Sequence, residues 1–212
     1  MNGPNFAGLA LQEVSIFVGD RPLVSDLSLT IAPGDVQTLM GPSGVGKSSL
    51  IAFIAGALPA GFSAEGHVAL NGRRLNGLPI EARRIGVLYQ DDLLFAHMSV
   101  GDNLAFALPA HYRKAERAHR VLAALREAEL EDFEARDPAT LSGGQKARVS
   151  LMRALLAEPE ALLLDEPFSK FDDALRERMR NFTFKQIRDR KLPALLVTHD
   201  PSDAPGAVHK LA

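Results

Sequence analysis

Residues 41–48 have the types and the spacing that bind phosphate. They follow the pattern G-x-x-x-x-G-K-[ST], in which glycines let successive backbone N–H groups turn inward toward phosphate oxygens. The Lys47 ammonium would reach the β- and γ-phosphates, and the Ser48 hydroxyl would ligate Mg²⁺. An ordinary Gly/Ser turn is the alternative, but the pattern favours a nucleotide site. The expected nucleotide contacts are Gly41, Pro42, Ser43, Gly44, Val45, Gly46, Lys47, Ser48 and Ser49.

The segments beside this loop have the order of strand, loop and helix that the pattern requires. Residues 36–40 form a short apolar run typical of a strand. Residues 49–55 are compatible with a helix, whose positive dipole end would face the phosphates. Four further stretches have strand-like patterns, and the third closes on a hairpin-type Asn-Gly turn: residues 9–17, 23–31, 66–71 and 84–89.

A second expected strand ends in acidic residues. Residues 161–164 are wholly apolar, as in a strand buried on both faces of a parallel sheet, and Asp165 and Glu166 follow at once. Ligands of open α/β sheets bind at that edge. We therefore expect Asp165 to hold Mg²⁺, often through water, and Glu166 to act as a general base on the water that attacks the γ-phosphate. A solvated acidic turn is the alternative.

The pattern between these two regions is helical. From about residue 99 to 158, Ala, Leu, Glu and Arg predominate, with apolar residues at the spacing of one helix face: Val121, Leu122, Leu125 and Ala128. Later elements are also expected: a helix capped by Asp172 that reaches about residue 190, and strands over residues 194–198 and 208–211.

The composition excludes several classes of protein. The 212 residues are 46% hydrophobic, carry a formal net charge of −2 and contain no cysteine, which rules out disulfides, thiolate zinc sites and thiol catalysis. The mild negative charge argues against broad capture of nucleic acid. No apolar run approaches the about 20 residues of a membrane-spanning helix, and the N-terminus lacks the features of a signal peptide. We therefore expect a cytoplasmic protein.

Basic residues form short clusters with acidic neighbours, so we expect them to be solvated surface. These clusters are Arg73-Arg74, Arg83-Arg84 and Arg113-Lys114.

Residues 141–145 form a second candidate anion site. Their sequence, Leu-Ser-Gly-Gly-Gln, opens a helical stretch and joins a helix N-terminus to a hydroxyl and two unobstructed backbone amides. A plain helix N-cap is the alternative. Because one phosphate loop is already present, a second phosphate-facing helix start would need a use of its own.

With these motifs in this order over nearly the whole chain, the sequence resembles the ATP-binding cassette (ABC) family, whose signature sequence residues 141–145 match. The resemblance implies an α/β fold: a P-loop NTPase core with a mixed central sheet, an antiparallel β subdomain and a helical signature subdomain. It implies one domain over residues 1–212, with residues 1–90 and 159–212 as the core and about 91–158 as the helical subdomain.

In that family two copies associate head to tail, and the signature of one copy closes over the nucleotide held by the other. The resemblance therefore implies that this segment acts on the γ-phosphate of a nucleotide bound to a second copy of the chain. The residues so assigned are Ser142, Gly143, Gly144 and Gln145.

Further positions match the family's motifs. Gln90, at an expected strand end, resembles the Q-loop glutamine, which would contact Mg²⁺ and the water. His199 resembles the switch histidine that hydrogen-bonds the γ-phosphate, although a lone His after a strand is more often structural. Residues 169–172 occupy the D-loop position, where the central Lys170 and Phe171 depart from the family's pattern.

The platform for the nucleobase is left open. The family usually stacks adenine on an aromatic residue just before the first turn glycine, where this chain has Val18, with Phe17 one residue earlier. Neighbouring strand residues normally face opposite sides. Either a local bulge lets Phe17 stack, or Val18 offers a weaker apolar platform.

Residues 91–100 resemble the part of importer-type cassettes that helps to line a groove for a cytoplasmic helix of the membrane subunit. Packing of this segment onto the core is the alternative. The resemblance implies three partners: a second copy, transmembrane permease subunits and, indirectly, a substrate-binding protein. It implies no nucleic acid and a place on the inner face of the cell membrane.

The implied activity is ATP hydrolysis that powers transport, import in particular, with ATP and Mg²⁺ as ligands. A soluble ABC-type ATPase acting on DNA or ribosomes, a small-molecule kinase and a non-hydrolysing ATP-binding module are the alternatives. The implied catalytic residues are Glu166, His199, Lys47 and Gln90, and the implied metal ligands are Ser48, Gln90 and Asp165.

Overall fold

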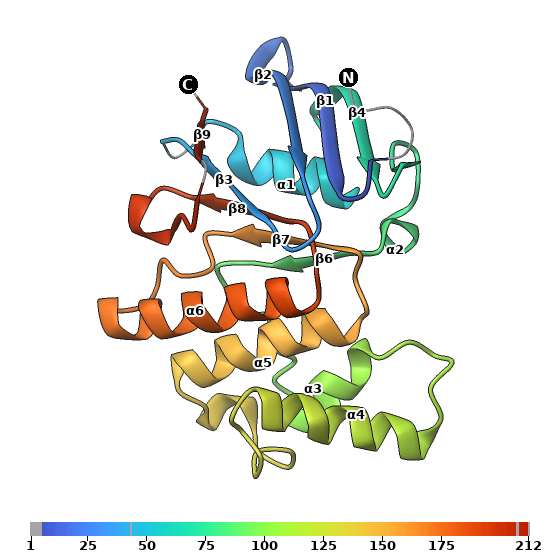
Figure 1. Cartoon of the computed structure of the whole chain (residues 1–212), viewed down its shortest axis with the longest axis vertical. Coiled ribbons are helices and arrows are strands. Elements are labelled where there is room, and N and C mark those ends of the chain that lie inside the picture. The colour runs from blue at the N-terminus through green and yellow to red at the C-terminus, as the bar shows by residue number, and fades with distance from the viewer. Residues whose placement is uncertain (1–5, 43, 207, 212) are drawn as a thin grey trace.

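The computed structural model describes residues 6–42, 44–206 and 208–211, and its strands form two sheets (Figure 1). The first sheet is antiparallel, with four strands in the order β2-β1-β4-β5. Its strands are β1 (Leu9–Val18), β2 (Arg21–Ile31), β4 (Phe62–Leu70) and β5 (Arg73–Arg74).

The second sheet has five strands in the order β6-β7-β8-β3-β9, and all of its pairings are parallel. Its strands are β3 (Val36–Met40), β6 (Ile85–Leu88), β7 (Ala161–Asp165), β8 (Ala194–Thr198) and β9 (Val208–Lys210). The expected α/β class is confirmed. One detail differs: the parallel and antiparallel strands lie in separate sheets, so the central sheet, over the described strands, is not itself mixed.

Helices cover both faces of the parallel sheet. In Figure 1, α1 (Lys47–Ala55) lies between the two sheets, whereas α5 (Gly143–Leu156) and α6 (Asp173–Asp189) lie on the opposite face, with α3 and α4 beyond α5. The remaining helices are α2 (Ile80–Arg83), α3 (Val100–Ala107), α4 (Lys114–Glu127) and the 3₁₀ turns η1 (Pro138–Thr140) and η2 (Pro201–Asp203). No helix in the described ranges has the length and apolar character to cross a bilayer.

The strand β7 divides the core in two, as its wholly apolar sequence predicts. Leu162 and Leu164 join a cluster with the helices α3 to α6, while Ala161 and Leu163 join a cluster with α1 and the antiparallel sheet. All four side chains are fully buried. The helices of residues 100–156 thus share one apolar cluster with the parallel sheet, and the division into a core and a helical subdomain stays a prediction.

Asp172 caps α6 as predicted, because its side chain accepts a hydrogen bond of 2.9 Å from the Leu175 N–H. The expectation for Arg83 was wrong. Its guanidinium is buried and donates to the carbonyls of Phe53 and Ile54, at 2.8 and 2.9 Å, at the end of α1. These carbonyls belong to the last turn of the helix, where the Phe53 carbonyl also accepts from the Gly56 N–H at 3.1 Å. A cation there suits the helix dipole, so Arg83 anchors the helix that follows the phosphate loop.

Candidate nucleotide site

The phosphate loop links β3 to α1 and takes a backbone shape that only glycine adopts easily. Gly44 and Gly46 have φ values of 82° and 100°. Gly46 is the N-cap of α1, and no side chain among the described residues caps that end, so its N–H groups are left for a ligand. Ser43, one of the expected contacts, lies outside the described residues.

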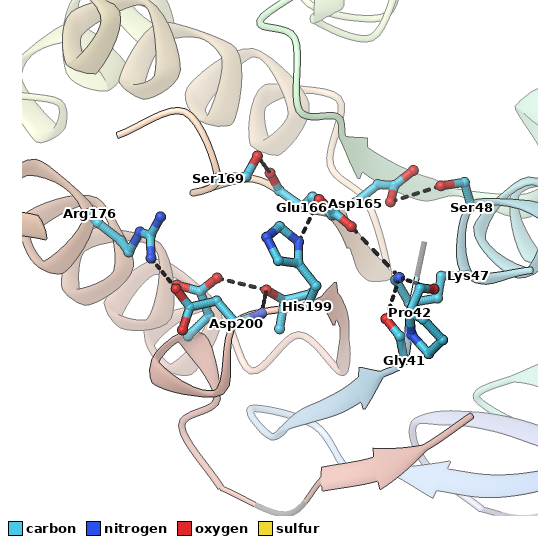
Figure 2. A network of polar contacts seen from close by, with 12 residues as sticks. Gly41, Pro42, Lys47, Ser48, Asp165, Glu166, Ser169, Arg176, His199 and Asp200 are labelled. Carbon is cyan, nitrogen blue, oxygen red and sulfur yellow. Dashed lines mark hydrogen bonds and ion pairs between the residues drawn. The ribbon is translucent and has the colours of Figure 1, made fainter. Parts of the chain in front are cut away.

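Lys47 is the buried charge of this loop. Its side chain is 5% exposed, and its Nζ donates to the carbonyl oxygens of Gly41 and Pro42, at 2.7 and 3.0 Å. Figure 2 shows it folded over the loop and facing Glu166. A buried cation on a phosphate-type loop is well suited to a phosphate ligand, because the low local dielectric strengthens charge pairing.

The end of β7 meets the start of α1, which brings Asp165 beside Ser48. The Ser48 hydroxyl donates to Asp165 Oδ1 at 3.2 Å (Figure 2). Burial raises the pKa of the Asp165 carboxyl, partly offset by the hydrogen bond from Ser48. A hydroxyl next to a carboxylate is the hard oxygen pair that Mg²⁺ prefers, so these two residues fit the ion that the motif implies.

Glu166 lies between two basic side chains. Its Oε1 is 3.8 Å from Lys47 Nζ, and its Oε2 is 3.0 Å from His199 Nδ1 (Figure 2). Its backbone has a φ of 48°, in the left-handed region that is costly for residues with a Cβ. Side chains from two separate segments, Lys47 and His199, therefore hold this carboxylate at the edge of the sheet.

A cavity of about 500 Å³ opens over these groups. It includes the predicted Gln90, which is exposed and follows β6, and it includes two apolar residues, Leu23 and Phe62, that the sequence did not single out. The lining residues are Leu23, Gly44, Gly46, Lys47, Ser48, Ser49, Phe62, Gln90, Asp165 and Glu166.

The two residues considered for the base platform do not line this cavity. Val18, at the end of β1, is 38% exposed and pairs with Phe62 across the antiparallel sheet. Phe17 pairs with Ser63, one step along. The sequence pattern does not single out Phe62 because it predicts a strand from residue 66, whereas β4 begins four residues earlier, at Phe62.

The signature segment is a well-formed helix start that does not line the cavity. The Ser142 side chain accepts from the Gln145 N–H at 3.4 Å, and the Gln145 side chain accepts from the Ser142 N–H at 2.9 Å. This reciprocal capping box confirms the N-cap. Gly143 is exposed, whereas Gly144 is buried against Leu175 of α6. Contact with a second copy's nucleotide is not tested by one chain and stays a prediction.

A buried network supports the loop that carries His199. Thr198 donates to Asp203 at 2.8 Å and accepts from the Asp200 N–H at 3.1 Å, while Arg176 of α6 pairs with Asp200 (Figure 2). Burial raises the pKa of the Asp203 carboxyl, which is 1% exposed. The loop is therefore fixed to α6 by charge and hydrogen bonds rather than left free.

Residues 91–100 combine anchored and exposed parts. The Asp92 carbonyl accepts from Ser150 at 2.9 Å, and Leu94 packs on the core, so part of the segment serves the alternative of internal packing. Leu93 and Phe106 are 56% and 62% exposed, and the ring of Phe106 meets Phe95 edge-on at 5.0 Å. Leu93, within this segment, and Phe106, which packs on its Phe95, thus leave exposed apolar surface there, called the apolar patch below.

The two central D-loop residues that depart from the family pattern have partners within the chain. Lys170 forms an ion pair with Asp91, the residue after Gln90. The ring of Phe171 lies 3.9 Å from where a Cβ on Gly143 would stand. The D-loop segment therefore touches both the Gln90 segment and the signature segment of the same copy.

The fold and the site together define a P-loop nucleotide-binding protein, with a glycine loop, a buried lysine and two carboxylates at the edge of a parallel sheet. Comparison with known proteins agrees. Residues 24–169 match the family described as ABC transporter, and the chain belongs to that family as an ATP-binding subunit.

Individual relatives support the same family. The chain is 48% identical over 197 residues to the uncharacterized ABC transporter ATP-binding protein YnjD of Escherichia coli (strain K12), covering 93% of this chain and 91% of that protein. It is 40% identical to the spermidine/putrescine import ATP-binding protein PotA of Pseudomonas aeruginosa (strain UCBPP-PA14), covering 96% of this chain. It is 39% identical to the sulfate/thiosulfate import ATP-binding protein CysA of Gloeobacter violaceus, covering 92%. The chain spans only 56% of the length of the PotA and CysA proteins.

Proposed function

We propose that this chain hydrolyses ATP to ADP and phosphate and so powers transport, import in particular, by separate membrane subunits. The observation that carries the proposal is that the phosphate-binding groups and the signature segment lie at different places on the chain. One cavity holds the loop, the buried cation and both carboxylates, while the residues of the signature helix start do not line that cavity.

The chemistry in the cavity falls to a few side chains. Lys47 supplies a nearly water-free positive charge where the γ-phosphate would lie. Glu166 acts as the general base for the attacking water, because Lys47 and His199 fix its carboxylate from two sides. Mg²⁺, when bound to Ser48, Asp165 and Gln90, would neutralise charge on the phosphate oxygens.

The site is completed, in this proposal, by a second copy in a head-to-tail dimer. Ser142, Gly143 and Gly144 of the partner copy would cover the γ-phosphate, with Gln145 at the edge of the contact. Support comes from the exposure of Ser142 and Gly143, which the chain's own cavity does not use. ATP would hold the two copies together, and hydrolysis would let them part.

The membrane partner would bind at the apolar patch around residues 91–100. Leu93 and Phe106 offer exposed apolar area there, next to a segment anchored by Asp92. Relatives named as import ATP-binding proteins support import over export. The chain would then sit at the inner face of the cell membrane, beneath permease subunits and indirectly served by a substrate-binding protein.

A mixing experiment tests the shared site. Lys47→Ala removes the phosphate cation, and Gly143→Asp places a negative charge on the signature without an internal clash, since the space at Gly143 is open to 3.9 Å. Each variant alone should release little phosphate. Mixed dimers contain one site with an intact loop from one copy and an intact signature from the other, so the mixture should regain activity.

The matched control replaces Gly143→Asp by the double variant Lys47→Ala/Gly143→Asp, which leaves no intact pair in any dimer. A first mixture no more active than its separate components would contradict the shared site.

A co-purification experiment tests the apolar patch. Membrane subunits should co-purify with the tagged chain, and Leu93→Asp should reduce their amount. Arg126→Glu, which changes an exposed charge on α4, is the control and should leave that amount unchanged.

A further inference from the structure

The lining of the cavity over the phosphate loop combines two kinds of residue. The loop, Lys47 and the two carboxylates supply polar and charged groups, and Leu23 and Phe62 supply large apolar side chains. The two kinds lie close together, because a Cβ on Gly46 would lie 2.9 Å from the Leu23 Cβ. A ligand that contacts both kinds must carry charged phosphate at one side and a flat apolar group at the other, as a nucleoside triphosphate does.

Strand register decides which aromatic side chain belongs to this apolar part of the lining. Directly opposed residues of an antiparallel pair point to the same face of the sheet. Ile16 is paired with Ala64 on the face that packs against α1, and two steps further Val18 is paired with Phe62. Val18 and Phe62 therefore continue that face to the end of the sheet beside the phosphate loop.

The same register directs Phe17 elsewhere. It pairs with the exposed Ser63 and alternates with Ile16 and Val18, so its ring belongs to the opposite face. No register shift separates residues 17 and 18 on the side that pairs with β4. The pairing with β2 does shift between Ile16 and Phe17, but the residue skipped there is Leu23 of β2. Residues 16–18 of β1 therefore keep the alternation that their regular pairing with β4 shows, and Phe17 stays on the opposite face.

From this geometry we infer that Phe62 is the stacking platform for the nucleobase of ATP, a role that rests on the proposed function. The aromatic ring comes from β4, across the sheet from Val18, rather than from β1 itself. Val18 and Leu23 flank the ring with aliphatic surface. Stacking is tolerant of the base, so the platform contributes affinity more than choice between purines.

The experiment compares two ligands that share the phosphates but differ in the base. Isothermal titration calorimetry with Mg-ATP and with Mg-tripolyphosphate is run on the wild type, Phe62→Ala and Phe62→Tyr. Phe62→Ala should weaken ATP binding about five- to a hundredfold, the usual cost of losing one base–aromatic stack, and leave tripolyphosphate binding unchanged. Phe62→Tyr keeps the ring and should bind ATP within about twofold of the wild type.

A spectroscopic arm does not depend on how Phe62→Ala folds. The chain contains no tryptophan, so Phe62→Trp introduces a single reporter. ATP should quench its fluorescence, and tripolyphosphate should not. Phe17→Trp is the matched control on the other face of the strand pair, and it should respond equally to both ligands.

The outcomes separate the two claims. A wild type that binds neither ligand would overturn the proposed function and the platform together. A wild type that binds both, with ATP affinity unaltered in Phe62→Ala or with base-specific quenching at Phe17→Trp instead, would overturn the platform and leave the phosphate site intact.

Discussion

Two helix starts in this chain use similar residues and differ in what surrounds them. At α1, Gly46 is the N-cap, no described side chain occupies the N–H groups, and a buried lysine and two carboxylates stand close by. At α5, Ser142 and Gln145 satisfy part of the helix start reciprocally, and the outer face is exposed. The first start is equipped to bind an anion by itself, whereas the second offers only a shaped surface.

The difference implies different consequences for mutations in the two regions. Changes near α1 should affect binding or chemistry in a single copy. Changes at the exposed start of α5 should leave a single copy's ATP binding intact and affect what two copies do together, whereas changes at its buried residues should affect the stability of the single copy. The predictions below test that contrast.

The largest effect is expected from Glu166→Gln. Loss of the general base should slow hydrolysis by about 10²–10⁴-fold, while binding should persist because Lys47 and the loop remain. In the presence of ATP, a dimer of the variant should then accumulate, and size-exclusion chromatography coupled to light scattering would detect it. A monomer at saturating Mg-ATP would remove the main support for the two-copy site.

Lys47→Ala should come next. Removing the buried cation from a phosphate contact should cost about 2–5 kcal/mol of ATP binding, measured by calorimetry. Lys170→Ala is the matched control, because Lys170 is half exposed and pairs with Asp91 on the surface. Loss of such an exposed ion pair should change the free energy of ATP binding, measured in the same way, by less than about 1 kcal/mol. Equal ATP affinity in the wild type and in Lys47→Ala would mean that this loop is not the phosphate-binding site.

In the signature region, substitutions at the adjacent Gly143 and Gly144 should have different effects, one on phosphate release and the other on the melting temperature. A Cβ on Gly144 would lie 2.7 Å from Leu175 Cδ1, so Gly144→Ala should lower the melting temperature. A Cβ on Gly143 would lie 3.9 Å from the ring of Phe171, an ordinary contact distance, so Gly143→Ala should keep the melting temperature and the ATP affinity of the monomer. It should nonetheless slow phosphate release if the proposed dimer forms, because a methyl group would obstruct the exposed backbone that the proposal places against the partner's nucleotide. Full activity in Gly143→Ala would count against that contact.

Local sequence was enough to predict the α1 region. The strand, glycine loop and helix are contiguous, and the wholly apolar run before Asp165 predicts the buried strand that the structure has at β7. The side chains that meet there, Ser48 with Asp165 and Glu166 with His199, follow from parallel strands ending at one edge.

Two residues were missed because their roles depend on tertiary pairing. Arg83 and Arg84 look alike in sequence, yet only Arg83 turns inward to the carbonyls at the end of α1. Phe62 lies just after a glycine, before the recognisable strand pattern, and only the register of β4 against β1 brings it to the cavity. Neither signal is present in a window of neighbouring residues.

The smallest expected effect is on the melting temperature and concerns Asp203, the buried carboxyl in the loop that carries His199. Burial raises the pKa of Asp203, so the folded protein holds this proton more tightly than the unfolded chain does. The stability linked to that proton is fully present below the unfolded pKa of about 3.9 and is lost as pH rises through the higher folded pKa. Asp203→Asn stays neutral, so its melting temperature relative to wild type should increase from acid to neutral pH.

Asp200, three residues earlier in the same loop, supplies a control of opposite sign. Hydrogen bonds from Ser202 hold the pKa of Asp200 below its usual range, so its ionised form stabilises the fold above the unfolded pKa and loses that effect as pH falls. Asp200→Asn should therefore lose stability relative to wild type as pH rises to neutral. The charges facing Asp203 are those of Arg176, Arg180 and Asp200, and the two arginines oppose the effect of burial. Melting temperatures of the two variants that change with pH in the same direction would contradict this prediction. They would mean that the two arginines cancel the effect of burial on the Asp203 carboxyl, so that ionised Asp203 does not destabilise the fold.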